Sequence, residues 1–141
     1  MKIKSLFFFS LFFLNGILTF AKQPFANDSI KKGKVILVSS SLGVALAGSY
    51  LYIENSWWNE KQRGFHFDNG SDKVYALNVD KVGHFIGGMQ AADIFSSSMQ
   101  WAGMGKKQSL WYGAAFGSGL QLAIEMKDAY APYWGFSKWD L

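Results

Sequence analysis

The sequence predicts an all-α fold, a small helical bundle of three to four helices that is embedded in a membrane and carries an aromatic-rich loop. Half of the 141 residues are apolar and 18% are aromatic. Only 17% are charged, whereas soluble domains carry roughly 25%. The apolar residues gather in long stretches with almost no charge, and the length fits one domain. This composition excludes intrinsic disorder, and the absence of cysteine excludes disulfide scaffolds, thiolate zinc sites and a lipid-modified N-terminal cysteine.

The first 21 residues have the pattern of an export signal. Lys2 and Lys4 precede an almost unbroken apolar run, which ends in Thr19-Phe20-Ala21. This pattern is typical of a secretory signal peptide, although so short a segment can also remain as an N-terminal anchor. We therefore expect an exported protein of the bacterial cell envelope. The expected organisation is a signal peptide or anchor, a polar linker and a single helical domain, over residues 1–21, 22–34 and 35–141.

The first uncharged stretch of that domain runs from Val35 to Ile53 and contains 19 residues. A helix that spans a bilayer needs about 20 predominantly apolar residues. Aromatic residues such as Tyr50 and Trp57 lie at its end, and such residues favour the membrane interface. A buried helix of a soluble bundle is the alternative, because it would also be apolar on all sides.

Residues 54–79 are polar, aromatic and rich in turn-forming residues. Asn69-Gly70 is a strong turn signal. Phe65-His66-Phe67 and residues 74–77 are the only strand-like segments, and they predict a short hairpin. A loop that caps the bundle with aromatic side chains is the alternative.

Two further helices are expected, over residues 82–104 and 110–124. Both are rich in small residues, and Gly113 and Gly117 follow the small-xxx-small spacing that lets two helices approach closely. Each glycine costs about 1 kcal/mol in a helix relative to alanine, so we expect a compensating contact between helices. Ser137 and Asp140 resemble a capping box, which predicts a fourth helix that starts near Lys138. Because the sequence stops at Leu141, before such a helix could form, we expect the domain to be truncated at its C-terminal end.

The charge distribution bears on partners. The net charge of +4 falls to +2 without Lys2 and Lys4, and there is no clustered basic face, so no nucleic-acid partner is expected. Small lysine clusters at 31–34 and 106–107 predict either a solubilising collar or attraction to anionic lipid. The expected partners are membrane lipid and either an envelope protein or a second copy, through helix–helix self-association.

Three polar clusters carry the candidate chemistry. Asp80 and His84 are four residues apart and share a helix face, so the carboxylate can hold the imidazole tautomer or complete a metal site. The structural alternative makes Asp80 a helix N-cap. Glu125 and Asp128 follow an apolar helix and would face protein or water, or simply emerge into solvent. The candidate catalytic residues are Asp80, His84, Glu125, Asp128 and Asp140. We expect no bound metal and no cofactor.

The same clusters carry a family resemblance. They are, in this order, Asp80-Lys81-x-Gly83-His84-Phe85, Glu125-x-x-Asp128 and Gly135-Phe136-Ser137-x-x-Asp140-Leu141. This set resembles the bacterial envelope family typified by the lipoprotein YfiM, over roughly residues 35 to 141. The pattern is more distantly similar to VanZ-like membrane proteins. The resemblance implies an envelope location and implies no particular activity.

These observations favour a non-enzymatic membrane protein of the bacterial cell envelope. One alternative is an envelope enzyme that acts on lipid or a lipid-linked sugar, with the five candidates as acid/base groups or hard-metal ligands. A His84 nitrogen within about 4 Å of Glu125 or Asp128 in a water-accessible pocket would favour this enzyme. A His84 bonded to backbone together with a solvent-facing Glu125 would argue against it. The other alternative is an interaction module that binds a partner through its aromatic loop, with Trp57, Trp58, Phe65 and Phe67.

Overall fold

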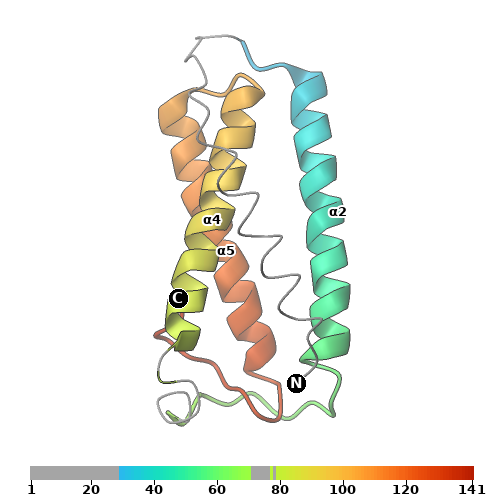
Figure 1. Ribbon diagram of the computed structural model, residues 1–141, viewed down its shortest axis with the longest axis vertical. Helices are drawn as coiled ribbons and strands as arrows, with labels where there is room; N and C mark the ends of the chain where they lie inside the picture. The colour runs from blue at the N-terminus through green and yellow to red at the C-terminus, as the bar shows by residue number, and fades with distance from the viewer. Residues whose placement is uncertain (1–28, 71–76, 78) are drawn as a thin grey trace.

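The computed structural model describes residues 29–70, 77 and 79–141, and the fold is given for these residues. They form three α-helices, α2 (Lys32–Ser56), α4 (Val79–Trp101) and α5 (Lys106–Asp128) (Figure 1). The described residues contain no β-strand, only an isolated parallel bridge between Phe67 and Phe136. The expected all-α fold is therefore confirmed. The predicted signal segment lies outside the described residues.

α2 and α5 are longer than the uncharged stretches that predicted them, whereas α4 has the expected length but begins and ends three residues earlier than residues 82–104. α2 starts at Lys32, inside the predicted linker, and α5 starts at Lys106. Lysine is a good helix former, so it ends an apolar stretch without ending the helix. α4 ends before Gly103, whose φ of 94° is a left-handed conformation that glycine adopts without steric cost. The chain then turns back and starts α5.

α4 and α5 are antiparallel and pack against each other along their length (Figure 1). Gly113 and Gly117 lie directly on the backbone of α4, and a Cβ on either residue would meet a carbonyl oxygen, of Ala92 or of Gly88 respectively. Phe95 and Phe116 stack across the same interface, with ring centroids 4.8 Å apart. The close contact expected from the small-xxx-small spacing is confirmed.

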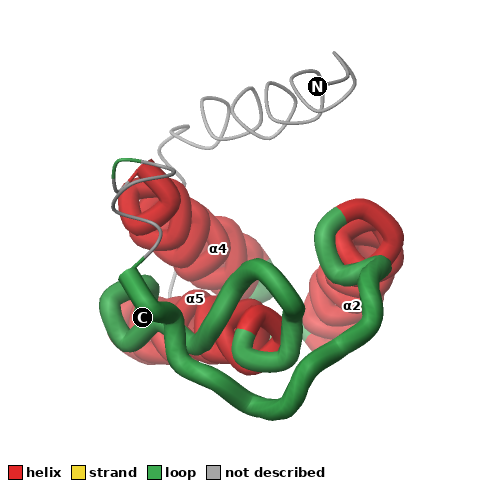
Figure 2. Tube along the Cα trace, turned by 90° about the horizontal axis from the view of Figure 1, so that it is seen from below, coloured by secondary structure: helices red, strands yellow, loops and turns green. Residues whose placement is uncertain are grey.

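α2 lies to one side of the α4–α5 pair (Figures 1 and 2). Only Val38 of this helix is buried. At the start of α2, the Lys31 N–H donates to the Ala102 carbonyl at 2.9 Å, and the Lys34 ammonium donates to the Trp101 carbonyl at 3.1 Å. At its end, Glu54 pairs with Lys127 of α5 at 2.6 Å. Polar contacts at the two ends therefore hold α2 in place.

The loop after α2 and the segment after α5 run together across one end of the bundle (Figure 2). The Arg63 N–H donates to the Tyr130 carbonyl at 2.8 Å, and the Phe136 N–H donates to the His66 carbonyl at 2.9 Å. Gly135 lies so close to Phe67 and Asp68 that a Cβ would overlap their backbone. The aromatic loop thus caps the bundle, and Phe67 pairs with Phe136. The other half of the predicted hairpin includes residues 74–76, which lie outside the described residues.

The predicted fourth helix is wrong. Residues 138 and 139 form a turn, and the Ser137 hydroxyl is buried without a hydrogen-bond partner, so it caps nothing. The Ser137 N–H bonds to Glu125 instead. The serine followed by an acid three residues later therefore reflects a long-range contact and not a helix start.

Burial in this bundle is inverted relative to a water-soluble helical protein. The buried polar residues are Ser96, Ser109, Gln121, Glu125, Ser137 and Asp140. Large apolar side chains point outward from each helix, including Val44 (75% exposed), Phe85 (70%) and Trp111 (72%). Small and polar residues therefore fill the contact between α4 and α5, and large apolar residues cover the outside.

Candidate functional site

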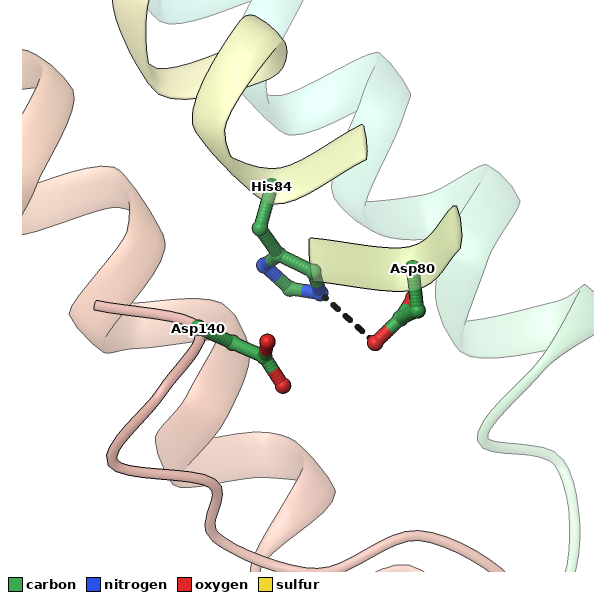
Figure 3. Close-up of side chains that lie close together, drawn as sticks. All are labelled: Asp80, His84 and Asp140. Atoms are coloured by element: carbon green, nitrogen blue, oxygen red, sulfur yellow. Dashed lines mark ion pairs between the residues drawn. The ribbon is translucent and has the colours of Figure 1, made fainter. Parts of the chain in front are cut away.

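The five candidate residues meet at one end of the bundle. Because α4 and α5 are antiparallel, the start of α4 lies beside the end of α5. The first turns of α4 supply Asp80 and His84, and the last turn of α5 supplies Glu125 and Asp128. The segment after α5 returns over this end and adds Asp140, so residues far apart in the sequence form one polar site (Figure 3).

Asp80 lies inside α4. The helix starts at Val79, so the expected N-cap role of Asp80 is wrong. An acid in the first turn is still favoured by the positive end of the helix dipole. The Asp80 Oδ2 atom lies 3.7 Å from the His84 Nε2 atom, as the four-residue spacing predicted (Figure 3).

The other ring nitrogen of His84 contacts Gln121. The Gln121 amide nitrogen donates to the backbone carbonyl of His84, and its Oε1 lies 3.0 Å from His84 Nδ1. Since the amide oxygen can only accept, His84 Nδ1 is the donor of this hydrogen bond. Gln121 is buried. Gln121 was not among the predicted site residues, although an uncharged polar residue within the apolar run 110–124 was the available signal.

Glu125 is the most deeply buried of the five, with 1% of its surface exposed. Its Oε2 accepts a hydrogen bond from the Ser137 N–H at 2.7 Å, and its Oε1 lies 3.7 Å from His84 Nδ1. The alternative in which this helix end emerges into solvent is wrong, because the segment after α5 folds over it. Burial raises the pKa of Glu125 to about 7, against the lowering effects of the Ser137 N–H and of His84.

Asp128 is held by the loop after α2. The Trp58 indole N–H donates to Asp128 Oδ1 at 2.6 Å. Burial raises the pKa of Asp128, and this hydrogen bond lowers it in part. Trp58 is buried, so it belongs to the site and not to the exposed aromatic surface that the interaction hypothesis requires. Trp57 and Phe67 do remain exposed, and binding of a partner through them stays a prediction.

Asp140 is almost completely covered and is bound by Lys81. The Lys81 ammonium lies 3.0 Å and 3.3 Å from the two carboxylate oxygens of Asp140. Lys81 was not among the candidates, although it lies between Asp80 and His84 in the sequence. It fixes the segment after α5 to the start of α4.

Carboxylates that can act as acid/base groups or as metal ligands lie on both sides of the His84 imidazole. The ligand atoms of two triads lie within 4.8 Å of one another, Asp80–His84–Asp140 on one side and His84–Glu125–Asp128 on the other. A pocket of about 290 Å³ is lined by His84, Lys81 and Asp140 together with apolar groups of α4 and α5. The 3.7 Å distance from His84 Nδ1 to Glu125 Oε1 meets the distance part of the criterion for the enzyme alternative, but Glu125 is 1% exposed and does not line this pocket.

The fold and the site define a small all-helical protein with a carboxylate-rich polar site at one end of its bundle. Its match to the family described as predicted periplasmic lipoproteins (DUF2279) covers residues 64–141, more than half of the chain. The chain belongs to this family, and all five candidate residues fall within the matched region. No curated protein and no solved structure matches the chain.

The family match confirms the expectation of an exported envelope family. Its description names a location and a lipid modification, and no catalytic activity. The 141 residues contain no cysteine on which such a lipid could be placed. The more distant resemblance to VanZ-like membrane proteins finds no support in these comparisons.

Proposed function

We propose that this chain is a membrane protein of the bacterial cell envelope, in which α2, α4 and α5 lie side by side in the bilayer. The observation that carries the proposal is the inverted burial of the bundle. Large apolar side chains that would be unfavourable in water are suited to lipid. Small residues at the contact between α4 and α5 are the usual means by which helices associate in lipid.

α2 supports the proposal by its length and composition. Among the described residues, it is the only helix that is long and apolar enough to cross a membrane by these criteria. Its ends are tied to the α4–α5 turn on one side and to the last turn of α5 on the other. If α2 crosses the bilayer, α4 and α5 therefore occupy the same layer. The spanning segments would be residues 35–53, 85–101 and 108–124.

Charged residues are placed consistently with this arrangement at both ends. The polar site, from Glu54 and Glu125 outward, lies beyond the spanning segments, and the lysines at 31–34 and 106–107 gather at the opposite end. Lysines at that level suit anionic lipid headgroups. Asp93 is the exception, because it is exposed halfway along α4. That side of α4 would have to face protein or water, which fits the expected envelope partner or self-association.

Carbonate extraction of an epitope-tagged chain tests the proposal. We expect the protein to remain in the membrane pellet. Val44→Asp places a charge on the most exposed part of α2 and should reduce the retained fraction, whereas Gly64→Asp in the loop should not. Release of the unmodified chain into the carbonate supernatant would contradict the proposal.

A second candidate function is that of an envelope enzyme acting on lipid or a lipid-linked sugar. The distance of 3.7 Å between His84 Nδ1 and Glu125 Oε1 favours it, because a carboxyl with a pKa near neutral can exchange protons beside an imidazole. The apolar lining of the adjacent pocket suits an acyl chain. The test compares the lipids and lipid-linked sugars of cells that carry the unmodified chain, Glu125→Gln or no copy, by mass spectrometry. A profile that changes with deletion and is restored by Glu125→Gln would contradict this candidate.

A further inference from the structure

We infer that Asp80, His84 Nε2 and Asp140 bind one divalent transition-metal ion, for which Zn²⁺ is the best-matched probe. This inference deepens the second candidate function, since it assigns a ligand to the same polar site. It does not depend on how the bundle is placed in the membrane.

The tautomer of His84 is the first support. Gln121 accepts from the ring at Nδ1 at 3.0 Å and donates to the backbone carbonyl of the same residue, so its own position is fixed by His84. Metal-bound histidines almost always donate their other ring N–H to a fixed acceptor in this way. Nε2 is then the ring nitrogen that is directed away from Gln121 and available to a metal ion.

The position of the carboxylates is the second support. Asp80 Oδ2 lies 3.7 Å from Nε2, which is too long for a direct hydrogen bond. Asp140 faces the same side of the ring (Figure 3). The three ligand atoms lie within 4.8 Å of one another. With bonds of about 2.0–2.2 Å, the ligand atoms of a tetrahedral Zn²⁺ lie about 3.3–3.6 Å apart, so atoms up to 4.8 Å apart must approach by as much as about 1.4 Å when the ion binds. The Asp80 side chain is 43% exposed, so it can move toward the ion.

Lys81 is compatible with a bound cation. It contacts both oxygens of Asp140, but each carboxylate oxygen has a second lone-pair direction. Carboxylates that bind metals are commonly held by such an outer hydrogen bond. The two carboxylates of Asp80 and Asp140 outnumber the one ammonium of Lys81, which favours a cation over an anion.

The opposite face of the imidazole is less suited to a metal ion. There the Nδ1 proton is directed at Gln121, Glu125 accepts from the Ser137 N–H, and Asp128 accepts from Trp58. A metal at His84–Glu125–Asp128 would first have to remove the Nδ1 proton from its acceptor. By contrast, His84 and Asp140 line the pocket of about 290 Å³, so an ion on their side has an entry path and room for a water molecule as fourth ligand.

Calorimetric titration of the purified full chain in detergent with Zn²⁺ alone tests the inference. We expect saturable binding of about one ion per chain. Asp80→Asn and Asp140→Asn should each weaken binding at least about tenfold, and Gln121→Met, which acts by positioning His84, should weaken it about tenfold or more. Asp93→Asn removes an exposed acid from the same helix and should bind as the unmodified chain does. Glu125→Gln and Asp128→Asn should also retain binding.

A second measurement separates loss of binding from loss of folding. Zn²⁺ should raise the thermal unfolding midpoint of the unmodified chain and of Asp93→Asn, and should leave that of Asp80→Asn unchanged. The inference is overturned by absence of saturable binding to the folded chain. It is equally overturned if Asp128→Asn abolishes binding while Asp80→Asn retains it. Carbonate extraction is read independently, so failure here and failure of the membrane proposal are distinguishable.

Discussion

The contact between α4 and α5 and the contact of α2 with that pair are built in opposite ways. α4 and α5 meet along their whole length, with glycines of one helix lying on the backbone of the other. α2 is held through polar contacts at its two ends, and Gly43 and Gly48 along its length have no neighbour within 4 Å. The α4–α5 contact therefore depends on close packing along both helices, and the contact of α2 depends on a few residues at its ends. Substitutions in the two contacts should therefore change the free energy of unfolding by different amounts.

The largest effect is expected from pH, through the buried carboxyl of the α4–α5 pair. The pKa of Glu125 is raised from 4.5 to about 7 in the folded state. The folded chain therefore binds this proton more tightly, and the free energy of unfolding falls as pH rises from about 4.5 to about 7, by on the order of 3 kcal/mol. Glu125→Gln should flatten the slope. Urea unfolding in detergent across this pH range measures the free energy of unfolding at each pH. An unchanged slope in Glu125→Gln would show that Glu125 does not cause the pH dependence.

Next in size is the effect of filling the helix contact. In Gly117→Ala the new methyl group would overlap the Gly88 carbonyl, so the helices must separate, at a cost of about 1–3 kcal/mol in the free energy of unfolding. Gly43→Ala in α2 is the matched control, because nothing lies near it and alanine is a better helix former by about 1 kcal/mol. Chemical unfolding in detergent compares the two. Equal effects would show that α2 is packed as closely as α4 and α5.

A smaller effect is expected at the end of α2 that lies beside the site. Trp58→Phe keeps the ring and removes the indole N–H that binds Asp128. Loss of a hydrogen bond to a charged group costs about 1.5 kcal/mol. Unfolding midpoints measure the loss, and Trp57→Phe on the exposed neighbouring residue provides the control. A loss of the same size in both variants would argue against a specific bond to Asp128.

The smallest effect is expected at the other end of α2. Lys34 donates to the Trp101 carbonyl and lies over the Trp101 ring at 4.1 Å, in an exposed position. Lys34→Ala should cost about 0.5 kcal/mol, and this loss should shrink in high salt. Unfolding at two salt concentrations checks both statements. A loss above that of Trp58→Phe would place the main attachment of α2 at its start.

The helices could be predicted because their central stretches are apolar and carry at most one charge, Asp93 in α4, whereas their ends could not. Lys32 and Lys106 look like boundaries in the sequence but continue the helix. The proximity of Asp80 and His84 followed from local spacing, since four residues make one helical turn. The close contact at Gly113 and Gly117 also followed from spacing.

The parts of the site that depend on long-range contacts could not be predicted from the sequence. Glu125 is buried beneath the segment after α5, whose Ser137 N–H bonds to it, and spacing along one helix does not report such a contact. Trp58 and Gln121 reach the site from the loop and from α5 as neutral side chains, which a search for ionisable clusters passes over. Lys81 was visible in the motif, but its partner Asp140 is 59 residues away.

The closure of the segment after α5 over the site has a consequence for biosynthesis. A chain made from its N-terminus completes α4 and α5 before Ser137 and Asp140 exist, so the Glu125 carboxylate and the Lys81 ammonium are uncovered during that interval. The Ser137–Glu125 and Lys81–Asp140 contacts then form together when the segment after α5 docks. The packing of this end of the bundle is therefore completed last, after both helices that carry Glu125 and Lys81 have been made.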